Sequence, residues 1–180
     1  MSEETEKTLK KTAFLSNLEK ENFEKLKELV KVRIIHAAQS EESFHIDYLV
    51  SNFSIFDLRL YKFIEESASF SWHGTYHTDL AKGERHTEIE IPHQREAEIQ
   101  VLRTLSTYTL EKMREYFDKL SGNYGFGWVL GLETSFVAYF KVSELGIKEK
   151  FLDNPLELRG RCGFRFPHYD LHLGFLSNSK

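Results

Sequence analysis

Half of the eight histidines of this chain lie in one short stretch, residues 72–93, and acidic side chains are interleaved with them. Imidazole and carboxylate groups bind zinc, iron and manganese, and histidine also transfers protons near neutral pH. The stretch therefore predicts a divalent-metal site, provided that the side chains share one face. The predicted metal ligands are His73, His77, His86 and Glu88.

The alternation of apolar residues in this stretch predicts a β-hairpin, whose connection is either a two-residue turn at residues 82–83 or a four-residue loop at residues 81–84. Placing the apolar side chains together requires Tyr76 opposite Ile89, and His77 then lies opposite Glu88 on the other face. The alternative interpretation is a solvated face with ordinary cross-strand charge pairs, each worth at most about 1 kcal/mol. No compact metal-ligand motif is present to decide between the two.

Three arginines share one face of a strand predicted at residues 157–166, which we call the arginine strand: Arg159, Arg161 and Arg165. The planar guanidinium group matches carboxylate and phosphate groups. The strand therefore predicts a site for an anionic small molecule or an acidic protein partner. The alternative is a sheet face whose arginines pair with some of the 28 acidic residues of the chain.

A further histidine pair follows directly, at His168 and His172, with Asp170 between them. On an extended segment these three side chains share one face, which predicts a second metal or acid–base cluster. We assign His168 and His172 as the candidate catalytic residues, in the role of proton transfer. A polar sheet face without chemistry is the alternative.

The other conspicuous side chains receive binding or structural interpretations. Four aromatic residues are expected to line a concave, ligand-binding face of the sheet: Trp72, Tyr76, Trp128 and Tyr139. Cys162 lies on the apolar face of the arginine strand, which favours a buried thiol over a nucleophile. His36 and His45 flank the end of the first predicted helix and are interpreted as capping or surface residues.

Two helices and eight strands are expected to position these residues. A Ser-x-x-Glu capping box and apolar residues at helical spacing predict a helix at residues 17–38, and a second helix is predicted at residues 94–120. Period-two alternation predicts strands at residues 44–50, 54–64, 68–80, 85–91, 126–132, 135–142, 157–166 and 169–175. The predicted fold is α+β, in the order α-β4-α-β4, with antiparallel sheet and both helices packed on one face.

Composition and charge restrict the class of protein. The apolar content of 41% suits one folded domain, predicted at residues 16–180 after a flexible tail at residues 1–15. The net charge of −4 disfavours nucleic acid as a partner, and no apolar run suits a membrane helix. The single cysteine and the charged N-terminus favour a soluble, cytoplasmic protein.

Three functional hypotheses follow from these residues. The first is a binding protein that holds an anionic small molecule or an acidic partner through the arginine strand and the concave aromatic face. The second is a divalent-metal-dependent hydrolase of a phosphate ester, in which the histidine and carboxylate cluster holds the metal. The third is an interaction protein that forms a homodimer by pairing of edge strands.

Overall fold

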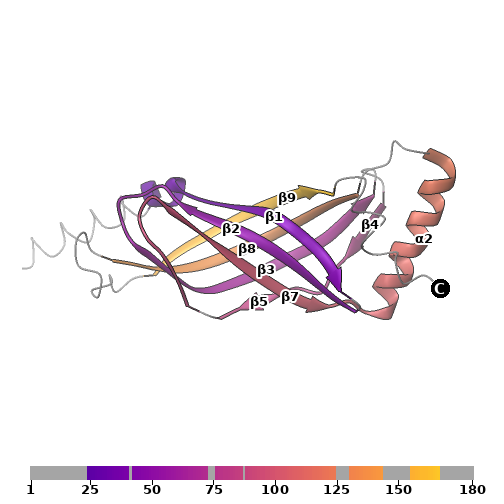
Figure 1. Cartoon of the computed structure of the whole chain (residues 1–180), viewed down its shortest axis with the longest axis horizontal. Helices are drawn as coiled ribbons and strands as arrows, with labels where there is room; N and C mark the ends of the chain where they lie inside the picture. The colour runs from indigo at the N-terminus through magenta and orange to yellow at the C-terminus, as the bar shows by residue number, and fades with distance from the viewer. Residues whose placement is uncertain are drawn as a thin grey trace, which may run out of the picture.

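The computed structural model describes residues 24–40, 42–72, 76–86, 88–124, 130–143 and 155–166. Antiparallel strands predominate in this part of the chain, and they form two sheets with a helix near each end of an elongated molecule (Figure 1). The predicted tail at residues 1–15 lies outside the described residues.

The first sheet has three antiparallel strands in the order β1-β2-β7, namely β1 (Val30–Ser40), β2 (Ser43–Asn52) and β7 (Arg95–Thr104). Along β7, buried side chains alternate with exposed ones. Ile99, Val101 and Arg103 point into the molecule, whereas Leu102 between them is exposed. One face of this sheet therefore belongs to the core and the other meets solvent.

The second sheet is built around the long strand β3 (Leu58–Trp72). On one side β3 pairs with β8 (Leu130–Val142), which pairs in turn with β9 (Leu156–Arg165). On its other side β3 pairs with three short strands placed one after another along its length: β4 (Tyr76–Asp79), β5 (Glu84–Arg85) and β6 (Ile89–Ile91).

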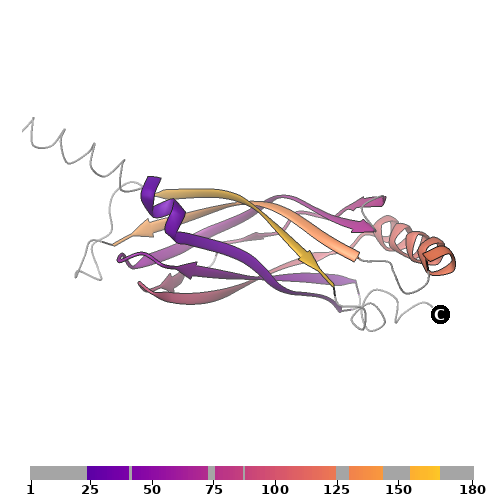
Figure 2. The ribbon, with the colours of Figure 1, turned by 90° about the horizontal axis from the view of Figure 1, so that it is seen from above.

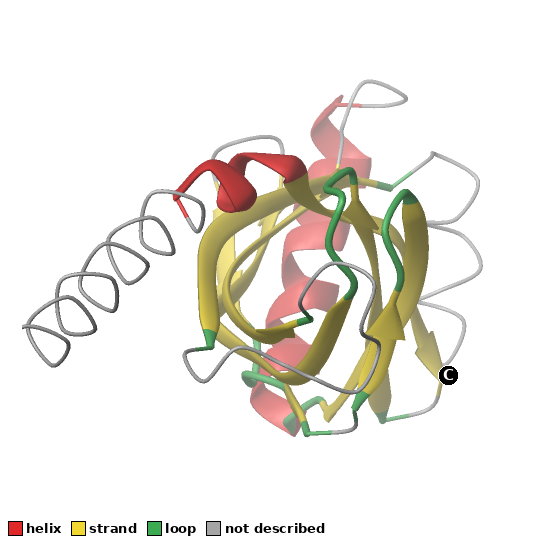
Figure 3. Ribbon diagram, turned by 90° about the vertical axis from the view of Figure 1, so that its left-hand side faces the viewer, coloured by secondary structure: helices red, strands yellow, loops and turns green. Residues whose placement is uncertain are grey.

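The two sheets face each other and enclose one interior, as the view along the molecule shows (Figure 3). At the edges, β9 lies beside β1 and β6 lies beside β7. The interior is aromatic: Phe63 packs between Tyr48 and Phe136, with ring centroids 4.7 and 5.2 Å away. Phe44 and Phe70 make an edge-to-face contact at 5.2 Å. The core of this sandwich thus lies between the sheets.

An ion pair lies inside this aromatic core. Arg103 on β7 contacts Glu65 on β3 through both terminal guanidinium nitrogens, at 2.6 and 2.9 Å, and both side chains are buried. The Tyr48 hydroxyl hydrogen-bonds with Glu65 Oε2 (2.9 Å) and with Thr134 Oγ1 (3.0 Å). Arg103 also donates to the carbonyl oxygen of Ala81. The network therefore joins β2 and β7 of one sheet to β3 and β8 of the other.

Both helices lie at the ends of the molecule. A helical segment at residues 24–29 leads into β1 at one end, and α2 (Thr107–Tyr124) lies across the other end (Figure 2). Ser106 caps α2, because its Oγ accepts a hydrogen bond from the backbone N–H of Thr109 at 3.1 Å. No helix in the described residues is long and apolar enough to cross a membrane.

The predicted α+β fold, with two helices packed on one face of the sheet, is wrong: the described chain is mostly antiparallel sheet. The helix predicted at residues 17–38 is strand from Val30 onward. A β-bulge after Ile34 shifts the register of β1. Because of this shift, the buried residues Val30, Ile34 and Ala37 are four and three positions apart, which is also the spacing of one helix face.

The helix predicted at residues 94–120 is helical only from Thr107, and β7 precedes it. The period-two signal of β7 is weak in the sequence because Arg103, a charged residue, occupies an inward position. The strands predicted at residues 44–50 and 157–166 are confirmed as β2 and β9. The strand predicted at residues 169–175 lies outside the described residues.

Removing the charge of Arg103 should destabilise the protein strongly, because Glu65 would remain buried without its counter-ion. For Arg103→Met we expect a loss of about 3–5 kcal/mol in the free energy of unfolding, measured by urea denaturation. Arg95→Met, at an exposed position of the same strand, is the matched control and should change it by no more than about 0.5 kcal/mol. Equal stabilities of the two variants would contradict this account of the core.

Candidate functional site

The predicted metal ligands that the structure describes do not converge. His77 on β4 lies next to Ser71 of β3, whereas Ile89 on β6 lies next to Leu60. At about 3.3 Å per residue, these positions place His77 roughly 30 Å from Glu88. The predicted hairpin register is wrong because β4 pairs with β3, and each short strand occupies its own part of the β3 edge.

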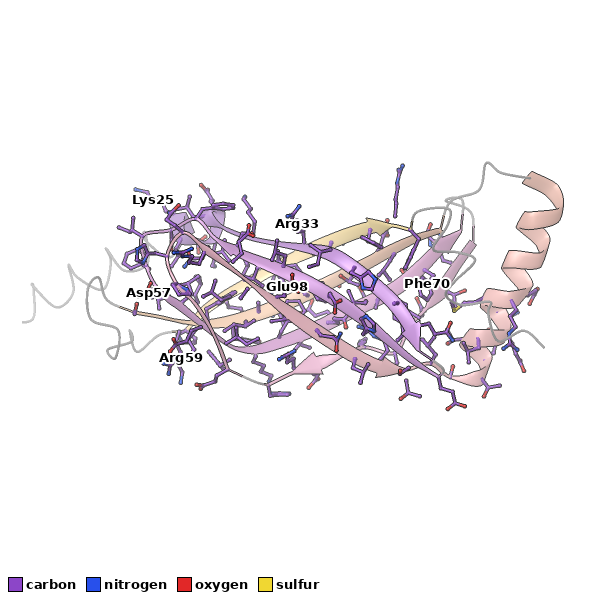
Figure 4. The ribbon with its side chains drawn as sticks, in the orientation of Figure 1. Lys25, Arg33, Asp57, Arg59, Phe70 and Glu98 are labelled. Atoms are coloured by element: carbon purple, nitrogen blue, oxygen red, sulfur yellow. The ribbon has the colours of Figure 1, made fainter. Side chains whose placement is uncertain are left out.

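The same separation is visible in Figure 4, where Phe70 and Arg59 of β3 lie toward opposite ends of the molecule. Near the Arg59 end, the Glu88 carboxylate lies 3.7 Å from the Arg59 guanidinium group. His86 pairs with its neighbour Glu84 at 3.0 Å. These contacts are exposed charge pairs, but their partners differ from the cross-strand pairs of the predicted hairpin, because His77 does not lie opposite Glu88.

Other predicted site residues lie outside the described part of the chain, namely His73, Trp128, His168 and His172. The side chains of Trp72 and Tyr76 also lie outside it. Tyr139 lies 6.1 Å from Tyr61, centroid to centroid, on the outer face of the second sheet. It pairs with Lys62 of β3, roughly 30 Å along the strand from Trp72.

The three arginines of the arginine strand lie exposed on the outer face of β9. Arg159 forms ion pairs with Glu157, at 2.8 Å, and with Glu66 of β3. Hydrogen bonding to Glu157 and the charge of Glu66 raise the pKa of Arg159. Arg161 and Arg165, in contrast, form no ion pair or hydrogen bond with any residue that the structure describes.

A polar groove of about 390 Å³ lies beside Arg161 on the outer face of the second sheet. The strand register aligns six of its lining residues in two rows across β3, β8 and β9: Ser67, Ser135 and Arg161 in one row, and Ser69, Glu133 and Gly163 in the next. We call these six residues the serine groove. The hydroxyls of Ser67 and Ser135 hydrogen-bond at 2.5 Å. Serine and glycine occupy four of the six positions, and their short side chains leave the space of the groove above the sheet.

A β-bulge in β3 gives the groove its serines. The register of β3 against β8 shifts between Glu65 and Ser67, so one extra residue stands between them. Glu65 is therefore buried in the core while Ser67 is exposed, and Ala68 returns to the interior. In an unbroken strand Ser67 would share the face of Glu65. One irregularity thus sends the carboxylate inward and the hydroxyls outward.

Two inward-pointing residues form the floor of the groove, Thr134 and Cys162. Thr134 belongs to the buried network through its hydrogen bond with Tyr48. The Cys162 thiol donates to the backbone carbonyl of Val32 on β1 at 3.4 Å, which links the neighbouring edges of the two sheets. Burial raises the pKa of the Cys162 thiol to about 11. The thiol is therefore protonated at neutral pH and has a structural environment.

The sequence interpretation missed most of the groove. Its available signal was the alternation of serine with apolar residues from Ser67 to Phe70, which is typical of a half-buried strand with a small-residue outer face. The sequence interpretation also missed the cluster of His36, His45 and Asp47, whose side chains meet on the outer face of the first sheet. The predicted helix hid that cluster, because it placed His36 outside any sheet.

No protein-family model and no curated protein matches the chain. Among solved structures, a crystal structure of a protein from Archaeoglobus fulgidus shows 9% identity over 77% of this chain and 95% of its own, with a TM-score of 0.36. A protein from Arabidopsis thaliana solved in solution shows 10% identity over 76% of each chain, with a TM-score of 0.37. The N-terminal domain of PorA shows 9% identity over 76% of this chain and 86% of its own, with a TM-score of 0.25. These likenesses are too distant to indicate a function for this chain.

The raised pKa of Cys162 predicts a slow and pH-dependent reaction with maleimide. At pH 8 the folded protein should react about a hundredfold more slowly than an exposed cysteine, because so little thiolate is present. The rate should rise as the pH approaches 11 and should become ordinary in urea, as mass spectrometry can measure. Rapid labelling of the folded protein at pH 8 would show that the thiol is accessible and ionised.

Proposed function

We propose that the protein is a binding module that holds an anionic group of a small molecule or acidic partner in the serine groove, with Arg161 as the anchor. The observation that carries this proposal is the exposure of Arg161 without a partner of opposite charge among the described residues. Its guanidinium group is exposed at the groove and has no acidic partner among the described residues. A carboxylate or phosphate is the group that completes such a fork of donors.

The setting of Arg161 favours binding of a defined ligand. Arg161 projects from a strand that is paired along its length with β8, so its backbone is held in place before a ligand arrives. The hydroxyls of Ser67 and Ser135 lie in the same row and supply further donors and acceptors. A hydrogen bond to a charged group contributes about 1.5–3 kcal/mol, so a small number of such contacts gives measurable affinity.

The groove also carries Glu133, which restricts the ligand. Its carboxylate would repel a ligand that is anionic over its whole surface, such as nucleic acid. It would accept hydrogen bonds from hydroxyl or amino groups beside an anionic group. We therefore infer a ligand with one carboxylate or phosphate and neighbouring hydrogen-bond donors. The net charge of −4 of the chain also disfavours nucleic acid as the ligand.

The other two hypotheses receive less support. Roughly 30 Å separates His77 from Glu88, so the metal-dependent hydrolase would need a different set of ligands. Pairing of edge strands needs an open edge, and in the described residues the main sheet edges lie beside each other, β9 beside β1 and β6 beside β7. As part of the same proposal we place the protein in the cytoplasm, because its single cysteine is a free thiol.

Charge reversal at Arg161 tests the binding proposal. We expect inorganic phosphate, citrate or a sugar phosphate to raise the melting temperature of the unaltered protein, and titration calorimetry to give the affinity. Arg161→Glu should weaken the binding at least about tenfold, because it removes the anchor and adds repulsion. Arg95→Glu changes the net charge equally on the other sheet and should leave the affinity unchanged.

Two outcomes would refute the proposal. The first is equal affinity of the Arg161→Glu and Arg95→Glu variants for every ligand that binds. The second is the absence of binding by any small carboxylate or phosphate ester at low ionic strength, where electrostatic attraction is strongest.

A further inference from the structure

Two histidines and an aspartate meet on the outer face of the first sheet, on the other side of the sandwich from the serine groove. His36 lies on β1, and His45 and Asp47 lie on β2. One ligand atom from each residue lies within 4.8 Å of the other two. His36 Nδ1 is 3.3 Å from Asp47 Oδ2, and His45 Nε2 is 3.7 Å from the same oxygen.

The β-bulge in β1 brings His36 into this group. Ile34 pairs with Tyr48, but the next paired residue of β1 is His36, which pairs with Asp47. In an unbroken ladder His36 would pair with Ile46 and share its inward face. The extra residue turns His36 to the outer face, directly beside the carboxylate of Asp47. Bulges commonly re-aim a side chain in this way at functional sites.

The distances fit a tetrahedral metal ion. Zinc binds histidine nitrogen at about 2.0–2.1 Å and carboxylate oxygen at about 2.0–2.2 Å, so two ligand atoms of a tetrahedral site lie about 3.3–3.5 Å apart. The separations of 3.3 and 3.7 Å from Asp47 Oδ2 are close to this range. The ligand atoms of His36 and His45 lie within 4.8 Å of each other, so binding of one ion would draw the two imidazoles together.

A third strand orients the carboxylate. Gln100 of β7 pairs with Asp47 in the sheet, and its Nε2 donates to Asp47 Oδ1 at 3.1 Å. This hydrogen bond occupies one carboxylate oxygen and leaves Oδ2 directed at the two histidines. Hydrogen bonds of this kind, from outside the ligand set, hold the ligands of metal sites in position. Three neighbouring strands thus contribute to one arrangement.

We propose that His36, His45 and Asp47 bind one divalent transition-metal ion, with zinc as the best match to two imidazoles and one carboxylate. Three protein ligands leave the fourth tetrahedral position open to water or to a bound group. The side chain of His36 is 57% exposed, whereas those of His45 and Asp47 are 21% and 20% exposed. Solvent therefore reaches the site, while two of its ligands are held by the sheet. This proposal does not depend on the serine groove.

Zinc titration of the full chain tests the site. After treatment with a chelator, calorimetry with zinc chloride should show one ion bound per chain. A His36→Ala/His45→Ala double variant should lose this binding, and Gln100→Leu should weaken it about 10–100-fold. Cobalt(II) at the same site should show the strong visible absorption of tetrahedral coordination, which a simple histidine–aspartate ion pair does not produce.

Two further variants locate the binding. His86→Ala removes an equally exposed histidine elsewhere and should bind zinc like the unaltered protein, as should a His168→Ala/His172→Ala double variant. Circular dichroism of each variant establishes that it folds, so that a loss of binding reports on the ligands. The proposal is overturned if the unaltered protein binds no zinc, if the His36/His45 double variant keeps full affinity, or if only the His168/His172 double variant loses it.

Discussion

The structure depends on a buried ion pair between Glu65 and Arg103, which belong to opposite sheets. Transferring two charges from water to an aromatic interior costs several kcal/mol per ion, and geometry has to offset this cost. Arg103 contacts both carboxylate oxygens of Glu65 and donates hydrogen bonds to the carbonyl oxygens of Ala81 and Val101. Gly83 lets the connecting chain approach, since a Cβ there would lie 2.2 Å from Val101 Cγ1 and 2.8 Å from Glu65 Oε1. All of these partners are in place only when both sheets and the segment at residues 80–83 are assembled, so the pair selects this packing over alternatives.

This constraint also shapes the outer surface. Glu65 has to point inward to meet Arg103, and the bulge that follows it returns Ser67 to the outer face. A second bulge, in β1, keeps Ile34 in the core while it turns His36 outward. In each case one extra residue interrupts the alternation of inward and outward side chains along the strand. The residues after the bulge therefore point to the opposite face from the one they would have in a regular strand. Both candidate sites, the serine groove and the His36–His45–Asp47 cluster, therefore rest on irregular positions of otherwise regular strands.

The same irregularities set the limit on what the sequence could predict. Regular alternation revealed β2 and β9, and it placed Arg161 and Cys162 on opposite faces of β9 as the structure has them. The bulge in β1 imitated helical spacing, and the inward Arg103 broke the apolar pattern of β7, so both strands were assigned to helices. Alternation along a single strand could not predict the candidate sites. The row of Ser67, Ser135 and Arg161 depends on pairing between strands that are distant in the chain. Such register is decided by packing of the whole core, and local pattern does not contain it.

The two candidate sites are joined by a short route through the core. Asp47 precedes Tyr48 on β2, and the Tyr48 hydroxyl reaches Thr134, which precedes Ser135 of the serine groove. Proximity alone does not couple two sites, because coupling requires an element with two arrangements that both ligands bias. Tyr48 is held by Glu65 and Thr134 within a packed aromatic interior, and burial together with the Glu65 charge raises the pKa of Tyr48, which keeps its hydroxyl protonated. These two hydrogen bonds, together with the ion pair between Glu65 and Arg103, hold the Tyr48 hydroxyl in one arrangement. The ion pair therefore holds the core between the two candidate sites in place. We expect a ligand bound at one site to leave the ligand affinity of the other site unchanged.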